Sequence, residues 1–131
     1  MERKIINPWT WQDRLGFVQA NEISGQQRVL LCAGQTSMDA EGNPVHADDM
    51  RAQITLVLDN LETVLKQSGL SLSSVMRLNY YTTDVDRFFE EYDTVTSRLE
   101  EADCRPASTL LGVQRLAFPE LLIEIEATAV V

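Results

Sequence analysis

The chain has 131 residues, the usual length of one domain and enough to bury a hydrophobic core. Hydrophobic residues make up 44% and charged residues 24%, which is ordinary globular usage and excludes a disordered chain. Its 20 acidic and 11 basic side chains give a formal net charge of -9, which argues against a protein that binds nucleic-acid phosphates. The single histidine excludes a metal site built from several histidines.

No stretch of the sequence points to a membrane or to export. No apolar run approaches the roughly 18–20 residues of a membrane span, and the N-terminal residues lack the apolar stretch of a signal peptide. We therefore expect a cytoplasmic protein without membrane contact. Cys32 lies in an apolar run and is interpreted as a buried hydrophobe, whereas Cys104 is expected to be partly exposed. Without repeats or linkers, residues 1–131 form a single expected domain.

Hydrophobic periodicity predicts the order of the elements. Strands are predicted at 17–23, 28–34, 76–82, 108–115 and 121–131, and helices at 48–68 and about 86–102. Gly69 is a natural C-terminal cap for the first helix, and Asp84 is an N-cap for the second. The order strand, strand, helix, strand, helix, strand, strand favours an α+β domain with one mixed sheet and both helices on one face.

The other face of that sheet carries both apolar and polar side chains. On the last strand, Glu124 and Glu126 alternate with the apolar row that faces the core. On the strand at 76–82, the odd positions Arg77, Asn79 and Tyr81 form a polar row. Charges on such a face can be paired across a subunit boundary, so we expect a homo-oligomer.

Several segments, in order, resemble the YjgF/Rid (reactive intermediate deaminase) family. CRPAS at 104–108 and LIEIEA at 122–127 are similar to its signature of Pro-Ala-Arg, a strand, a short loop and an apolar-Glu-apolar-Glu-Ala strand. LGFVQ at 15–19 is similar to its Gly-Pro-Tyr-Val-Gln segment, and AGQT at 33–36 to its Ser-Gly-Gln turn. The resemblance covers nearly the whole chain.

The resemblance implies a chorismate-mutase-like α+β protomer and a homotrimer with a central barrel and three clefts between subunits. In active members each cleft hydrolyses small enamine or imine metabolites without a metal or an organic cofactor. An arginine holds the substrate carboxylate through two parallel charge-assisted bonds, and a glutamate orients the attacking water. For this chain the resemblance therefore implies a small-molecule ligand, no metal and no cofactor.

The position of the family's arginine is occupied here by Ser108, a short neutral side chain. Losing a charge-assisted bond costs about 1.5–3 kcal/mol, which argues against the classical hydrolysis of 2-imino acids. Arg105 is a weak substitute, and an exposed or interface ion pair is its alternative role. Glu124 falls on the water-positioning glutamate, and a structural glutamate in the barrel is its alternative role.

Three more positions belong to the implied binding site. Phe17 stands where many members carry tyrosine, and Tyr92 falls where the archetypal enzymes carry asparagine. Tyr92 also fits a core position on the second predicted helix. Gly34 corresponds to the glycine of the family's Ser-Gly-Gln turn, where the backbone can approach a ligand closely. Together with Ser108, these residues describe a cleft that is more aromatic and less cationic than that of the relatives.

Two functions remain open at this point. The first is a diverged family member that binds or hydrolyses a small metabolite, such as an imine or enamine, in clefts between subunits. The second is a non-catalytic trimer that binds a metabolite or regulates another process. Whether the chain is an enzyme is left open. A nuclease, the function attached to some relatives, is disfavoured by the net charge of -9.

Overall fold

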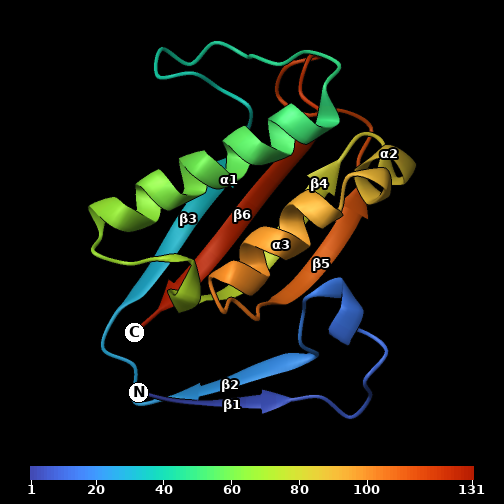
Figure 1. Ribbon diagram of the computed structural model, residues 1–131. Coiled ribbons are helices and arrows are strands. Elements are labelled where there is room, and N and C mark those ends of the chain that lie inside the picture. The colour runs from blue at the N-terminus through green and yellow to red at the C-terminus, as the bar shows by residue number, and fades with distance from the viewer.

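The computed structural model describes all residues from 1 to 131, with two sheets and three α-helices (Figure 1). In chain order the elements are β1 (Glu2–Ile6), a 3₁₀ turn (Asp13–Leu15), β2 (Ala20–Ser24), β3 (Val29–Gln35), α1 (Met50–Gln67), a second 3₁₀ turn (Leu72–Ser74), β4 (Val75–Thr82), α2 (Val85–Glu90), α3 (Asp93–Glu101), β5 (Ala107–Gly112) and β6 (Ile123–Val130). No helix is both long enough and apolar enough to span a membrane.

The main sheet has four strands in the order β3-β6-β4-β5. β4 and β5 are parallel, and the other neighbours are antiparallel, so the sheet is mixed. Helices α1 and α3 lie side by side across one face, while the opposite face has no helix over it (Figure 1). The predicted α+β class, with a mixed sheet and helices on one face, is confirmed.

The β1–β2 hairpin is separate from the main sheet, so the prediction of one sheet is wrong. The sequence pattern predicts no strand before residue 17, but β1 pairs with β2 from Glu2↔Ser24 to Ile6↔Ala20. The hairpin lies across the end of the main sheet where β5 begins (Figure 1). A Val18 N–H to Pro106 O bond of 3.0 Å and an Asn21 Nδ2 to Met76 O bond of 2.9 Å join it to that sheet.

The long helix predicted at 86–102 is interrupted, because α2 ends at Glu90 and α3 begins at Asp93. At the break, the Glu91 N–H bonds Phe88 O three residues back at 3.1 Å, which tightens the chain. The hydroxyl of Tyr92 donates to Leu15 O at 2.7 Å, so this residue is tied to the N-terminal segment. A contact over such a distance in sequence leaves no trace in helical periodicity.

The predicted caps Gly69 and Asp84 are confirmed, and Asp49 is an N-cap that the sequence pattern did not single out. Asp49 begins α1 by accepting the Ala52 N–H at 3.0 Å, and Asp84 begins α2 by accepting the Arg87 N–H at 3.0 Å. Gly69 follows α1 with a φ of 74°, in the left-handed region where glycine is favoured. The predicted strand at 17–23 begins late, at Ala20, since the chain first makes the 3₁₀ turn.

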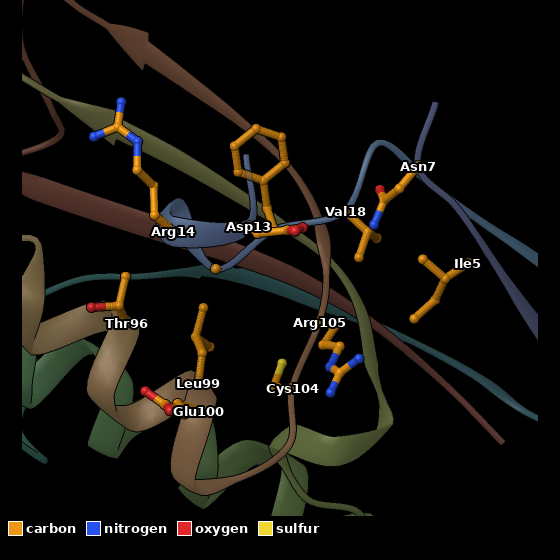
Figure 2. A pocket seen from close by; sticks show the side chains of 12 residues that line it. Ile5, Asn7, Asp13, Arg14, Val18, Thr96, Leu99, Glu100, Cys104 and Arg105 are labelled. Carbon is orange, nitrogen blue, oxygen red and sulfur yellow. The ribbon is translucent and has the colours of Figure 1, made fainter. Parts of the chain in front are cut away.

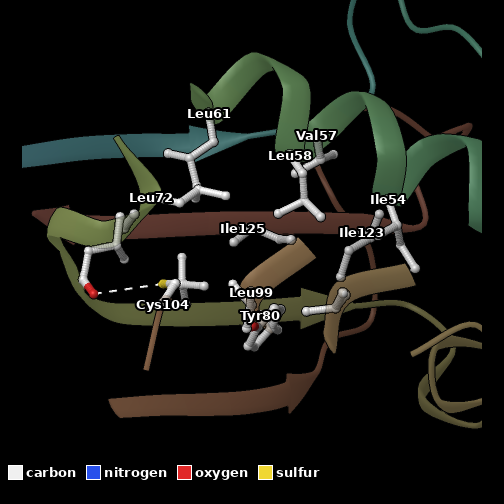
Figure 3. Packing of buried hydrophobic residues seen from close by; sticks show 14 of the residues in the cluster. Ile54, Val57, Leu58, Leu61, Leu72, Tyr80, Leu99, Cys104, Ile123 and Ile125 are labelled. Atoms are coloured by element: carbon white, nitrogen blue, oxygen red, sulfur yellow. Dashed lines mark hydrogen bonds between the residues drawn. The ribbon is translucent and has the colours of Figure 1, made fainter. Parts of the chain in front are cut away.

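The core lies between the sheet and the helices α1 and α3 (Figure 3). Fully buried side chains of α1, β4, α3 and β6 meet there, including Ile54, Leu58, Leu61, Leu78, Leu99, Ile123 and Ile125. Burying one such side chain contributes about 1.5–3 kcal/mol. Cys32 is buried as predicted, but Cys104 is only 3% exposed, so its predicted partial exposure is wrong. Burial raises the pKa of Cys104 to about 12, which leaves its thiol protonated and unreactive.

Candidate ligand-binding site

An aromatic pocket of about 170 Å³ lies where β4 and β5 meet α2 and the first 3₁₀ turn. Its lining consists of the aromatic residues Phe17, Tyr80, Phe88, Phe89 and Tyr92, with Leu15, Ser108 and Leu110. The pocket thus brings together three of the predicted ligand-binding residues, Phe17, Tyr92 and Ser108, which are up to 91 positions apart in the sequence. None of the eight lining residues is charged.

Strand pairing places Ser108 on this side of the sheet. In the parallel pair β4–β5, Ser108 is opposite Leu78, and Leu110 is opposite Tyr80. Leu78 and Tyr80 are buried beneath the helices, so Ser108 shares the helix-covered face. Its hydroxyl is the short polar group that β5 contributes to the pocket.

The break between α2 and α3 positions Tyr92 at the pocket. Its hydroxyl donates to Leu15 O at 2.7 Å and so joins the helical layer to the 3₁₀ turn. Gly16 ends that turn with a φ of 77°, and Phe17 follows directly in the pocket wall. Burial raises the pKa of Tyr92 to about 12, so its side chain is a neutral phenol at physiological pH.

The aromatic rings pack edge to face rather than in parallel stacks. The ring centroids of Phe88 and Tyr92 are 5.4 Å apart at 66°, and those of Phe89 and Tyr92 are 6.0 Å apart at 63°. Tyr80 packs against Phe88 at 5.6 Å, and its buried hydroxyl lies near that of Tyr92 without forming a hydrogen bond of good geometry. Sequence periodicity marks Phe88 and Tyr92 as core residues, whereas Tyr80 and Phe89 are pocket residues that it missed.

A second, larger pocket of about 490 Å³ lies between the hairpin and α3 (Figure 2). Arg105 lines this pocket together with Asp13, Arg14 and Glu100, and Phe17 is the residue it shares with the aromatic pocket. Figure 2 shows Arg105 beside Cys104, on the opposite side of the pocket from Arg14. The Arg105 side chain is exposed and pairs with Asp103 at 3.4 Å. Arg105 therefore does not line the aromatic pocket of this protomer.

Glu124 and Gly34 lie together on the opposite, uncovered face of the sheet. Glu124 is opposite Tyr81 in the β4–β6 pair, and Tyr81 points away from the side of Tyr80. A Cβ atom on Gly34 would be 2.7 Å from Cδ of Glu124, so the glycine makes room for this side chain. One protomer therefore holds Ser108 and Glu124 on different faces of the same sheet.

The two glutamates of β6 are in different electrostatic states. Partial burial, and to a smaller extent the neighbouring charge of Glu126, raises the pKa of Glu124 above its usual value. Glu126 accepts hydrogen bonds from the Tyr81 hydroxyl and from Asn79 Nδ2, which lower its pKa. Glu126 is thus held as a carboxylate, while Glu124 is the more basic group. No three His, Cys, Asp or Glu side chains gather to form a metal site.

Comparison with known proteins extends over the whole chain. The family model described as Endoribonuclease L-PSP matches residues 13–131. A RutC family protein from Pyrococcus horikoshii is 31% identical over 100 residues, which cover 76% of this chain and 77% of the relative. The crystal structure of YyfB from Yersinia pestis, described as a protein of unknown function of the conserved Rid protein family, covers all of both chains with 38% identity and a TM-score of 0.88.

Two solved structures from E. coli are more distant. The YjgF gene product is 26% identical with a TM-score of 0.70, over 87% of each chain. TdcF with bound serine is 24% identical with a TM-score of 0.70, again over 87% of each chain, a likeness that shows the fold alone. The family match and the agreement in both sequence and structure show that the chain belongs to the Endoribonuclease L-PSP family, whose members are also called YjgF, RutC and Rid proteins.

Proposed function

We propose that the chain forms a homotrimer whose inter-subunit clefts bind a small imine or enamine metabolite and hydrolyse it. The observation that carries the proposal is the convergence of Phe17, Tyr92 and Ser108 on one pocket. These three positions, which are far apart in sequence, are among those that the family resemblance assigns to ligand binding, whereas Gly34 and Arg105 lie outside the pocket. TdcF, a protein of the same fold, holds serine in its structure, which supports a small metabolite as the ligand.

The uncovered face of the main sheet supports the trimer. On this face Leu31 is 78% exposed and lines a pocket of about 190 Å³ with Arg77 and Glu126. A large apolar side chain among charged groups is typical of a subunit interface, where the apolar surface is covered and the charges are paired. Because Ser108 and Glu124 lie on different faces of one protomer, the proposed cleft requires a neighbouring protomer to bring its own copy of this glutamate to the aromatic pocket.

Glu124 has the chemistry of a general base. In the proposed reaction the oxygen of a water attacks the carbon of the C=N bond, and the Glu124 carboxylate accepts the proton of that water. Glu124 then returns this proton to the nitrogen of the carbinolamine, the C–N bond breaks to release ammonia or an amine, and the carboxylate accepts the hydroxyl proton as the carbonyl forms. A carboxylate with a raised pKa accepts this proton more readily than an ordinary one.

Ser108 limits which substrates this site accepts. We infer that the chain belongs to a divergent subgroup in which the arginine of the Pro-Ala-Arg motif is absent. Purified protein is expected to hydrolyse 2-iminobutanoate at least about 100-fold more slowly than a relative with the arginine, since a charge-assisted clamp is missing. Hydrolysis at the relative's rate would contradict the proposal and would indicate that Arg105 holds the carboxylate.

A non-catalytic trimer that binds a metabolite is the second candidate function. It is favoured by the neutral lining of the aromatic pocket, which contains no acid or base. This candidate predicts that a ligand raises the melting temperature without turnover, and that Glu124→Gln leaves the binding unchanged. The proposed hydrolase predicts instead that Glu124→Gln abolishes turnover. Light scattering that gives three times the chain mass of 14.8 kDa would support both candidates, and a monomer would contradict both.

A further inference from the structure

We infer that the aromatic pocket selects a small organic cation without a carboxylate, namely a protonated imine or amine. This inference rests on the proposed function and specifies its ligand class. It concerns the pocket lined by Phe17, Phe89, Tyr92 and Ser108 together with the buried rings of Tyr80 and Phe88. Three features of this pocket carry the inference: its charge, its rings and its size.

The charge of the pocket disfavours an anion. None of the lining side chains is charged, and burial raises the pKa of both phenols, so they remain neutral. A carboxylate that entered would lose water without gaining a counter-charge, which is strongly unfavourable. The net charge of -9 adds a long-range field that repels anions and attracts cations.

The rings provide the attraction that the missing charges do not. Five of the eight lining residues are aromatic, and the centroids of Phe88, Phe89 and Tyr92 are 5.4 to 6.1 Å from one another. The face of an aromatic ring attracts a cation whose centre lies within about 6 Å of the centroid. Phe88 and Tyr80 are buried, so Phe17, Phe89 and Tyr92 are the rings that a cation in the pocket can approach.

The size of the pocket and its polar groups further restrict which ligands fit. A cavity of about 150 Å³ holds one benzene molecule, so the volume of about 170 Å³ suits a ring of five or six atoms. The buried Tyr80 hydroxyl lies near that of Tyr92 but forms no hydrogen bond of good geometry, and the Ser108 hydroxyl is a second acceptor in the wall. Either oxygen can accept a hydrogen bond from the N–H of a protonated imine.

The ligand class implies the kind of reaction that supplies the substrate. An imine that carries a carboxylate arises from oxidation or elimination of an amino acid. An imine without one arises from oxidation of an amine, in which the carbon beside the nitrogen is oxidised and an electron acceptor of the supplying enzyme is reduced. The pocket therefore fits the product of an amine-oxidising reaction.

Three compounds of similar size and different charge test the inference. Pyrrolidine is a cation at pH 7, cyclopentanol is neutral and cyclopentanecarboxylate is an anion. In NMR titrations of the purified full-length protein, pyrrolidine is expected to bind at least about tenfold more tightly than the carboxylate, with cyclopentanol between them. Equal binding, tighter binding of the carboxylate, or no binding of pyrrolidine would overturn the inference.

Two matched variants distinguish the effect of the pocket's rings on ligand preference from the effect of the acidic surface. Phe89→Leu removes a ring from the wall and keeps an apolar side chain, whereas Phe118→Leu makes the same change outside the pocket. The two positions are similarly exposed, at 50% and 43%. Phe89→Leu is expected to reduce the preference for pyrrolidine over cyclopentanol about fivefold, and Phe118→Leu is expected to leave it unchanged. An equal effect of the two variants would overturn the inference.

Different experiments test the inferred ligand class and the proposed function. A monomer in light scattering contradicts the proposed function whatever the three compounds do. A preference for cyclopentanecarboxylate in a trimeric protein contradicts the ligand class alone.

Discussion

The side chain of Glu124 on β6 lies directly over Gly34 on β3, so closely that a Cβ atom on the glycine would be 2.9 Å from Cγ and 2.7 Å from Cδ of the glutamate. The backbone of Gly34 does not have a positive φ, so glycine is not required for its conformation. It is required for space, and that space determines where the candidate base points.

Replacing this glycine is therefore predicted to move Glu124 without unfolding the protein. Gly34→Ala forces the carboxylate away from its position, and a displacement of about 1 Å can reduce turnover about 100-fold. Steady-state kinetics would give this loss in kcat, and circular dichroism would show an unchanged fold. Gly112→Ala is the control, because it adds the same methyl group on β5, where the nearest atom is Val85 Cγ2 at 3.0 Å. Full activity of Gly34→Ala would show that Glu124 takes no part in the reaction.

The two glutamates of β6 are predicted to affect stability with opposite signs. The folded-state pKa of Glu124 is raised above 4.5, so its ionisation destabilises the fold as the pH rises from 4.5 through the raised value. The pKa of Glu126 is lowered from 4.5, so its carboxylate stabilises the fold above pH 4.5 and this contribution is lost as the pH falls through the lowered value.

At pH 7, Glu124→Gln should therefore raise the melting temperature, and Glu126→Gln should lower it. Both differences from the wild type should shrink as the glutamates become protonated in acid. Thermal unfolding of both variants at pH 3 to 8 checks the prediction. The same sign for both variants at pH 7 would show that burial and hydrogen bonding do not distinguish the two carboxylates.

Local features of the fold could be predicted from the sequence. The alternation on β6 separates Ile123 and Ile125 from Glu124, and the structure buries the two isoleucines and leaves the glutamate on the uncovered face. The caps at Asp84 and Gly69 are likewise encoded within one turn of chain. Such features depend on neighbours in sequence, so pattern and propensity are sufficient to find them.

Features that depend on distant contacts could not be predicted. The break in the second helix coincides with the bond from Tyr92 to Leu15, whose positions differ by 77. The face of Ser108 could be expected only from the family resemblance, because its register with Leu78 on β4 decides it. The separation of the hairpin depends on bonds such as that from Val18 to Pro106. Each of these contacts is made only when the chain has folded.

The buried Tyr80 and the partly buried Tyr92 of the aromatic pocket are predicted to respond differently to loss of the hydroxyl. Tyr92→Phe removes the donor to Leu15 O, leaves that carbonyl without its partner and should reduce the free energy of unfolding by about 1 kcal/mol. Tyr80→Phe removes a hydroxyl that forms no hydrogen bond of good geometry, so it should be neutral or stabilising. Urea unfolding of both variants gives the comparison. A larger loss for Tyr80→Phe would show that its hydroxyl forms a bond in solution.

The last prediction concerns the position where the arginine is missing. Ser108→Arg places a guanidinium in the aromatic pocket, where it can hold a carboxylate through two charge-assisted bonds. We expect hydrolysis of 2-iminobutanoate to increase about 10- to 100-fold, mainly through kcat/KM, and binding of pyrrolidine to weaken because like charges repel. Thr109→Arg is the matched control, since it adds the same charge one residue later on β5, on the opposite face of the strand. Equal gains from both variants would mean that a positive charge near the cleft is sufficient. No gain from Ser108→Arg would mean that Ser108 alone does not account for slow hydrolysis of 2-imino acids.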